Sequence, residues 1–139
     1  MFDMSFLLYR SETEVAPGSA TARQILNEAQ TRNADHAVTG YLHHEENFFF
    51  QWLEGPTPAL DGITAKIQRD PRHHHLTFLW RGTTDDRQFD GWDMGYSTIA
   101  DGSLLSWLAE NPVAQRERRA YASSVLAFLQ CRTEATRAD

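Results

Sequence analysis

Short apolar runs separated by polar turns fill the first hundred residues of this chain. Four of them are rich in aromatic and branched side chains and have the length of strands. These runs are residues 4–9, 37–42, 48–53 and 76–80. A fifth, less regular strand is predicted over residues 89–96, where Gly91 and Gly95 weaken the pattern.

Two other segments place their apolar residues on one side of a helix. The first is predicted to begin after Ser19, a candidate N-cap, and to run to about Asn33. The second ends where Asp70-Pro71 stops the pattern. The apolar positions with helical spacing are Ala22, Ile25, Leu26 and Ala29 in the first helix and Ala59, Leu60, Ile63 and Ile67 in the second.

The resulting order of elements is βαββαββ, with residues 43–47 (HHEEN) as the predicted hairpin loop between the second and third strands. Two helices on one face of a sheet leave the other face bare. A short helix around residues 104–108 and a longer one over residues 113–130 are predicted next, and residues 133–139 are expected to be disordered. These helices must cover the bare face or join a partner chain there.

Length and composition narrow the class of protein. A chain of 139 residues, of which 41% are apolar, forms one domain whose core needs no metal or disulfide. The net charge of −6 argues against binding to the phosphate backbone of nucleic acid. The single Cys131 fits a reducing cytoplasm, and no apolar run approaches the roughly 20 residues of a membrane helix. We therefore expect a cytoplasmic protein with no nucleic-acid or membrane partner.

The charged and histidine clusters give weak signals for chemistry. The run His73-His74-His75 would point in alternating directions along an extended segment, so no metal site is expected. His43 and His44 fit a solvated turn, and the four aspartates at positions 85, 86, 90 and 93 fit a charged surface loop. Nucleophile elbows, phosphate-binding loops and dinucleotide fingerprints are missing from the sequence, so no catalytic residues are assigned and an enzyme is not expected.

Three polar residues call for a different explanation. Gln51 interrupts the apolar run of residues 48–53, so its amide needs hydrogen-bond partners inside the protein. Tyr9 closes the first predicted strand and Asn33 the first predicted helix, from where both could face one groove between helix and sheet. The residues themselves leave two interpretations open: three satisfied polar groups that hold a core together, or part of a binding site.

Four ordered motifs in this chain resemble the BLUF domain, the blue-light sensor using flavin. They are residues 33–40 (NADHAVTG), 49–55 (FFQWLEG), 67–73 (IQRDPRH) and Arg87-x-Phe89-x-x-Trp92-x-Met94. The resemblance covers about residues 4–97, which predicts a photosensor domain over residues 1–98 and a C-terminal helical extension over residues 99–139 of a short, stand-alone BLUF protein. Family members commonly carry a tyrosine and a glycine in the hairpin where this chain has HHEEN.

The resemblance implies an α+β fold, a ferredoxin-like βαββαββ sheet with a flavin ring between its two helices and the C-terminal helices on the other face or at a dimer interface. FAD is the expected flavin, with FMN and riboflavin as alternatives. The photoactive residues would be Tyr9, Gln51, Trp92 and Met94. The flavin would be held by Ile25, Arg32, Asn33, Leu42, Phe49, Gln51, Ile67, Asp70, Arg72 and His73.

The implied function is photoreception without substrate turnover. On illumination Tyr9 would give up an electron and then a proton, and Gln51 would keep a rearranged hydrogen-bond pattern, because an amide can exchange its donor and acceptor ends. The signal would pass from a homodimer or higher homo-oligomer to an unknown protein partner. Two other classes stay open: a flavin-free interaction module, and a small ferredoxin-like enzyme resembling acylphosphatases, whose backbone anion cradle the first loop lacks.

Overall fold

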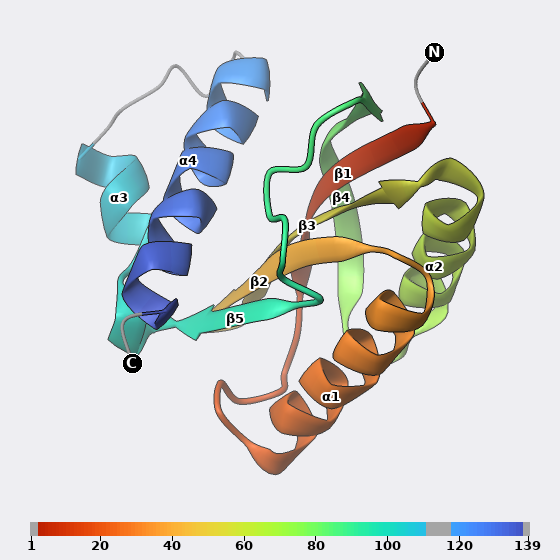
Figure 1. Cartoon of the computed structure of the whole chain (residues 1–139). Coiled ribbons are helices and arrows are strands. Elements are labelled where there is room, and N and C mark those ends of the chain that lie inside the picture. Colours follow the sequence, from red (N-terminus) through yellow and green to blue (C-terminus); the bar gives the residue numbers. More distant parts are fainter. Residues whose placement is uncertain (1–2, 111–117, 138–139) are drawn as a thin grey trace.

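A computed structural model describes residues 3–110 and 118–137, and within these residues the strands form one five-stranded mixed sheet (Figure 1). The strands are β1 (Met4–Glu12), β2 (Thr39–Glu45), β3 (Phe48–Pro56), β4 (His74–Thr84) and β5 (Gly95–Thr98). They are arranged in the order β4-β1-β3-β2-β5, and all neighbours are antiparallel except β2 and β5. The predicted α+β, ferredoxin-like fold is confirmed.

Helices α1 (Ala20–Asp35) and α2 (Thr57–Arg69) lie on the same face of the sheet (Figure 1). The predicted N-cap of α1 is confirmed, because the Ser19 hydroxyl accepts a hydrogen bond of 3.2 Å from the backbone N–H of Ala22. Helix α2 follows β3 directly and carries a proline in its first turn, where a missing N–H costs nothing.

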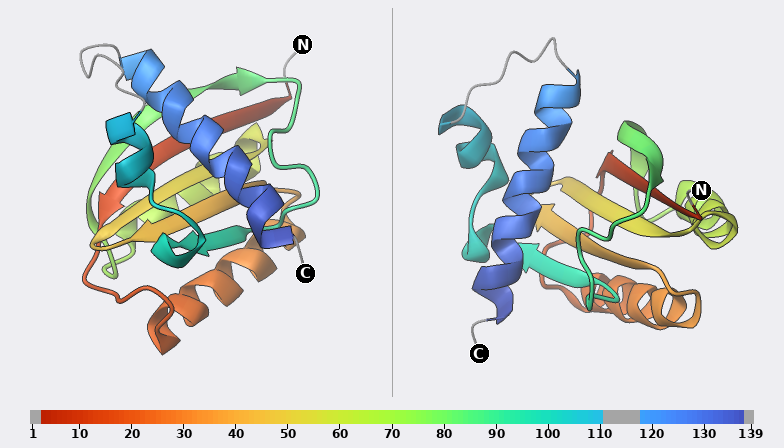
Figure 2. Two further views of the ribbon diagram at one scale, coloured as in Figure 1. Left: turned by 90° about the vertical axis from the view of Figure 1, so that its left-hand side faces the viewer. Right: turned by 45° about the horizontal axis from the view of Figure 1, so that its top comes forward.

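The opposite face is covered by the C-terminal helices of the same chain (Figure 2). They comprise a 3₁₀ turn (Ile99–Asp101), α3 (Leu104–Glu110) and α4 (Arg118–Arg137), and α4 packs against β4, β2 and β5. The prediction that the C-terminal helices cover the bare face of the sheet is thereby confirmed. Residues 113–117 of the predicted long helix lie outside the described residues. The disorder expected over residues 133–139 is wrong for residues 133–137, since α4 continues to Arg137 with Thr133 bonded to the Gln130 carbonyl, and residues 138–139 lie outside the described residues. Among the described residues no helix is long and apolar enough to cross a membrane.

Each face of the sheet has its own apolar core, because successive side chains of a strand point to opposite faces. Along β1, Leu7 and Tyr9 pack under α1 and α2, whereas Leu8 packs under α4. The core on the α1 and α2 side includes Val38, Leu42, Phe49, Leu53, Leu60 and Ile63. The core under α4 includes Tyr41, Phe50, Trp52, Val125, Phe128 and Leu129.

The β2–β3 hairpin differs from its prediction. Only Glu46 and Asn47 form the turn, and His43, His44 and Glu45 belong to β2 and are buried. Their burial is tolerated because they are hydrogen-bonded. His43 bonds Glu45 at 2.9 Å and the Ser97 hydroxyl at 2.7 Å, and Glu45 also accepts hydrogen bonds from the start of α3. The solvated-turn interpretation of His43 and His44 is therefore wrong.

The fifth strand is shorter and later than predicted, so Trp92 and Met94 lie in the segment before β5. Gly91 adopts a positive φ of 85°, a left-handed backbone conformation that glycine accepts readily. The buried carboxylate of Glu54 anchors its start by accepting hydrogen bonds from the backbone N–H groups of Gln88 and Phe89. The four aspartates of residues 85–93 are exposed, which confirms the charged surface loop.

The covering role of α4 predicts a stability difference between two apolar positions. Phe128→Ala should lower the free energy of unfolding by about 3–5 kcal/mol, because Phe128 is 1% exposed and fills the core under α4. Leu105→Ala on α3 is the control and should change it by less than about 1 kcal/mol, since Leu105 is 39% exposed. Equal effects in urea titrations would contradict the packing of α4.

Candidate functional site

A groove between α1 and α2 contains most of the predicted site residues. Its lining consists of Tyr9, Ile25, Glu28, Ala29, Arg32, Leu42, Phe49, Gln51, Ile67, Asp70, Arg72 and His73. The structure thus brings together every residue predicted to hold a flavin except Asn33. The enclosed part of the groove measures about 90 Å³.

The floor of the groove is a row of side chains across three strands. The strand register places Gln51 of β3 opposite Tyr9 of β1 on one side and opposite Leu42 of β2 on the other. The Tyr9 hydroxyl donates a hydrogen bond to Gln51 Oε1, and Gln51 Nε2 donates to Met94 Sδ at 3.4 Å. The prediction that the Gln51 amide is bonded inside the protein is confirmed.

Electrostatics keep the Tyr9 phenol protonated. Burial raises its pKa well above the usual value of a tyrosine, and the nearby positive charge of Arg32 opposes this only in part. Burial also lowers the pKa of Arg32, which lies on α1 at the rim of the groove. A protonated phenol is required for the hydrogen bond to Gln51 Oε1.

The wall formed by α1 presents four residues in helical spacing: Ile25, Glu28, Ala29 and Arg32. Glu28 was missed by the sequence analysis. The signal that could have found it is its position three residues after Ile25, which places both side chains on the same face of the helix.

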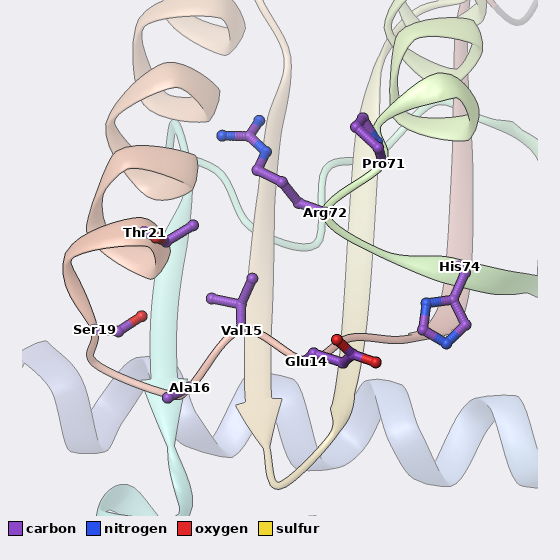
Figure 3. A pocket seen from close by; sticks show the side chains of 8 residues that line it. All are labelled: Glu14, Val15, Ala16, Ser19, Thr21, Pro71, Arg72 and His74. Atoms are coloured by element: carbon purple, nitrogen blue, oxygen red, sulfur yellow. The ribbon is translucent and has the colours of Figure 1, made fainter.

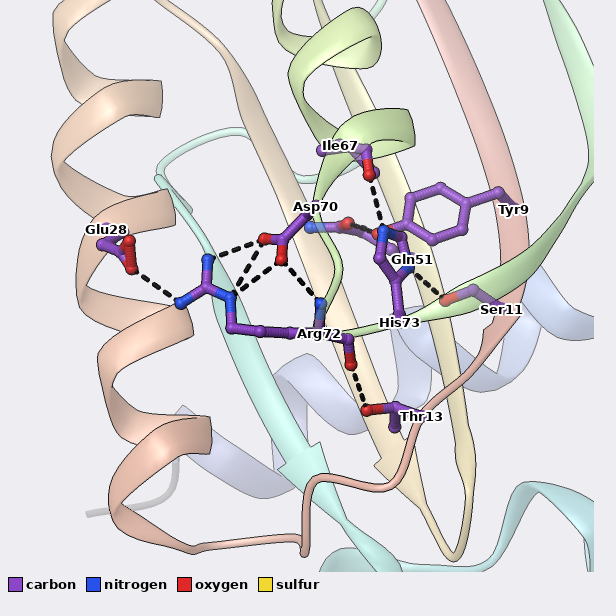
Figure 4. A network of polar contacts seen from close by, with 9 residues as sticks. All are labelled: Tyr9, Ser11, Thr13, Glu28, Gln51, Ile67, Asp70, Arg72 and His73. Carbon is purple, nitrogen blue, oxygen red and sulfur yellow. Dashed lines mark hydrogen bonds and ion pairs between the residues drawn. The ribbon is translucent and has the colours of Figure 1, made fainter.

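Arg72 bridges the mouth of the groove between α1 and the loop after α2 (Figure 4). Its guanidinium donates to Glu28 at 2.9 Å and to Asp70 at 2.7 Å. The hydrogen bonds from Arg72 hold the pKa of Asp70 below its usual value. The Thr13 hydroxyl donates to the carbonyl of Arg72 at 2.6 Å, so the loop that carries Arg72 is also tied to the end of β1.

His73 lies inside the groove beside Tyr9, with ring centroids 6.1 Å apart. Its Nε2 lies 2.6 Å from the carbonyl of Ile67 and must donate there, so Nδ1 accepts from the Ser11 hydroxyl at 2.7 Å (Figure 4). These contacts connect the loop after α2 to β1.

Asn33 and Trp92 do not line the groove. The Asn33 amide is fully buried and donates to the backbone carbonyl of Asp93 at 2.7 Å. Trp92 packs on the other side against Tyr41, with ring centroids 5.6 Å apart. The Asn33 and Trp92 contacts position residues 92–94 so that Met94 reaches Gln51.

A second, polar hollow of about 550 Å³ adjoins the groove (Figure 3). Arg72 lines both spaces. The hollow is also lined by Ser19 and Thr21 at the start of α1, where the helix dipole favours negative charge. Its remaining lining residues are Glu14, Val15, Ala16, Pro71 and His74.

Apolar side chains together with a few placed polar groups, here the Tyr9 phenol and the Gln51 amide, are typical of a small-molecule binding site. A family model described as sensors of blue-light using FAD, the BLUF family, matches residues 4–95. The chain belongs to the BLUF family, whose members are blue-light sensors that bind flavin.

Three known proteins illustrate the similarity. The dark-state structure of the BLUF protein BlrB shares 27% identity with a TM-score of 0.73, covering 93% of this chain and 99% of that one. Photoactivated adenylate cyclase subunit beta of Euglena longa is 39% identical over 71 residues, which are 51% of this chain and 8% of the cyclase subunit. The blue light- and temperature-regulated antirepressor BluF of Escherichia coli K12 is 31% identical over 86 residues, 62% of this chain and 21% of BluF. The chain thus matches only a small part of these two relatives.

His44 closes the end of β2 next to the site. Its ring lies 4.5 Å from the Phe49 ring, and its Nε2 donates to the carbonyl of Val15 at 3.0 Å. The Tyr96 hydroxyl lies 3.1 Å from Nδ1, which is left as an acceptor. Burial lowers the pKa of His44 to about 4, so the ring is neutral in the folded protein at pH 7.

The low pKa of His44 predicts a loss of stability in mild acid. An unfolded histidine binds its proton near pH 6.5 and the folded one only near pH 4. The contribution of His44 is therefore fully present above pH 6.5 and is lost as the pH falls toward 4, by about 3 kcal/mol at most. In urea titrations between pH 7 and 4.5, His44→Gln should weaken this dependence, while His36→Gln, at an exposed histidine, should keep it. An unchanged dependence in His44→Gln would contradict the buried neutral ring.

Proposed function

We propose that Tyr9 and Gln51 are the light-responsive pair of this sensor and that the flavin binds in the groove above them. When bound, the flavin supplies absorption of blue light and an excited state that oxidises a nearby phenol. The observation that carries the proposal is the continuous series of contacts from Tyr9 through the Gln51 amide to Met94 on the groove floor.

The residues of the groove fit a flavin chemically. Leu42, Phe49, Ile25 and Ile67 give apolar faces for a wide ring, and Arg32 supplies a donor for its polar edge. The enclosed volume of about 90 Å³ is smaller than the roughly 300–1,000 Å³ of ordinary ligand pockets. We therefore infer that the bridge of Arg72 to Glu28 and Asp70 opens when the ring enters.

The polar hollow beside the groove favours FAD over FMN and riboflavin. A diphosphate that leaves the groove past Arg72 reaches a space bordered by the start of α1, and both features attract anions. Chromatography of the flavin released from the purified protein tests this assignment directly.

The chemistry of the pair follows from its hydrogen bonds. Tyr9 is the oxidisable side chain on the groove floor, and its O–H points at Gln51 Oε1, so the phenol proton would leave along this hydrogen bond and would return along it when the phenoxyl radical regains its electron. The Gln51 amide can exchange its donor and acceptor ends without a move of the backbone. Such an exchange removes the hydrogen bond from Nε2 to Met94 Sδ.

The signal leaves the groove through β5. Met94 directly precedes this strand, whose Ser97 bonds His43 at 2.7 Å. His43 bonds Glu45, and Glu45 accepts from the backbone N–H of Leu104 in α3 at 2.7 Å. In this proposal residues 1–98 sense light and residues 99–139 transmit the signal to a protein partner, without catalysis in the sensor itself. A homodimer and a cytoplasmic location remain predictions from the sequence.

Tyr9→Phe should bind flavin and lose the light response. The ring still packs on the groove floor, but the oxidisable hydroxyl and its hydrogen bond to Gln51 are gone. The measurement is the absorption spectrum before and after blue light, in which the wild type should shift reversibly to the red. Gln51→Leu, of similar volume, should also bind flavin and show no shift. A normal red shift in either variant would refute the proposal that Tyr9 and Gln51 are the light-responsive pair.

Glu45→Gln should separate light sensing from its output. The residue lies on the face opposite the groove, so the spectral shift should persist. A neutral amide accepts more weakly from the Leu104 N–H and the Ser103 hydroxyl, so amide exchange at the start of α3 should become at least about tenfold faster in the dark. The light-dependent difference in exchange there should shrink. If amide exchange at the start of α3 in Glu45→Gln equals that of the wild type both in the dark and in the light, Glu45 is not part of the signalling route.

A further inference from the structure

Two of the three consecutive histidines converge on one glutamate at the far end of the sheet. His73 turns into the groove, whereas His74 and His75 of β4 both lie beside Glu12 of β1. One nitrogen from each of these two rings and one carboxylate oxygen of Glu12 all lie within 4.8 Å of one another. The sequence-based expectation that these histidines cannot share an ion assumed a regular strand, and β4 is not regular here.

The irregularity is a β-bulge. The pairing of β1 with β4 shifts between Arg10 and Glu12, because three steps along β4 are matched by two along β1. His75 takes a left-handed backbone conformation with a φ of 53°. These features cancel the usual alternation of side chains, so neighbouring histidines reach the same carboxylate.

We propose that Glu12, His74 and His75 bind a divalent transition-metal ion of the zinc type. Imidazole nitrogen and carboxylate oxygen are its common ligands, at about 2.0–2.2 Å. Two ligands of a tetrahedral ion are then about 3.4 Å apart, and the three donor atoms, which now lie within 4.8 Å of one another, must each shift by about an ångström or less to reach this spacing. The side chains can do so because His74 and His75 are exposed, and three protein ligands leave a position for water.

The contacts already present do not account for the cluster. His75 Nδ1 lies 2.8 Å from Glu12 Oε2, an exposed pair that contributes little to stability. The His74 side chain makes no hydrogen bond within the described part of the chain, although its ring lies 4.7 Å from that of His75. A metal ion would use all three side chains and would join β1 to β4 at Glu12, the residue that directly follows Ser11, whose hydroxyl contacts His73 in the groove.

Calorimetric titration of the full chain with zinc chloride, in the dark and in a weakly coordinating buffer, tests the proposal. The wild type should bind one ion per chain. His74→Ala and His75→Asn should each weaken binding at least about tenfold, and asparagine at position 75 tolerates the left-handed backbone. His36→Ala and Cys131→Ser are the controls: each removes another exposed potential ligand and should leave the affinity unchanged.

Thermal unfolding supplies a second measurement. Zinc should raise the midpoint of the wild type and of both controls, because a ligand that binds only the folded state stabilises it. It should not raise the midpoint of His74→Ala or His75→Asn at the same concentration. Absence of wild-type binding at millimolar zinc, or wild-type affinity in both histidine variants, would overturn the site. Neither measurement uses illumination, so the proposed light response is tested separately.

Discussion

A carboxamide in the middle of the central strand imposes the constraint around which the sensor side of the sheet is organised. Gln51 is 4% exposed and lies among apolar side chains, where an unpaired amide costs about 1–3 kcal/mol. Its two ends need different partners, an O–H donor for Oε1 and an acceptor for Nε2. The first requirement fixes the register of β1 against β3, because Tyr9 must stand opposite Gln51. The second requires that Met94 be brought to the sheet by a segment that is not a strand.

Residues 92–94 are held in place through their backbone carbonyls, each of which accepts a hydrogen bond. The Asn33 amide donates to the carbonyl of Asp93, Gln30 donates to that of Met94 at 3.1 Å, and the N–H of Gly40 donates to that of Trp92 at 3.0 Å. Each bond comes from a different position on α1 or β2. Residues 92–94 are therefore fixed relative to both the helix wall and the sheet, and a change at Gln51 meets a segment whose position is defined.

On the face of the sheet under α4, buried carboxylates each accept hydrogen bonds from several N–H and O–H donors. Glu54 accepts from two backbone N–H groups, the Trp52 indole and the Thr39 hydroxyl. Glu45 accepts from the start of α3 and from His43. Both carboxylates thus attach later parts of the chain to β2 and β3. Removal of the donors would leave buried carboxyl oxygens without hydrogen-bond partners, so this face depends on residues 85–110 for its stability.

Periodicity predicted most of the fold, because the residues concerned act through their own element, whereas most residues of the groove were predicted only through the resemblance to the BLUF family. The spacing of Ile25 and Ala29 identifies the inner face of α1, and the apolar run around Gln51 identifies a buried strand. The hairpin could not be predicted in this way. The sequence pattern predicted that His43 and Glu45 are solvated, because their hydrogen-bond partners Ser97 and Leu104 lie more than fifty residues later in the chain. The convergence of His74 and His75 depends on a bulge, which the local pattern of residues does not encode.

The energies of these contacts determine how far a light signal must spread. One exchanged hydrogen bond at Gln51 changes the free energy by about 0.5–1.5 kcal/mol, whereas a switch from 1:99 to 99:1 requires about 5.5 kcal/mol. Met94 can supply a comparable further amount, since burial of a methionine side chain is worth about 1.5–3 kcal/mol and this one is 3% exposed. The two together still fall short of the requirement. The rest of the required free energy has to come from contacts beyond Met94. On the proposed signalling route, these are the hydrogen bond between Ser97 of β5 and His43 and the hydrogen bond that Glu45 accepts from α3. In the proposed mechanism, a complete switch is therefore a property of the sheet edge and the C-terminal helices as much as of the groove.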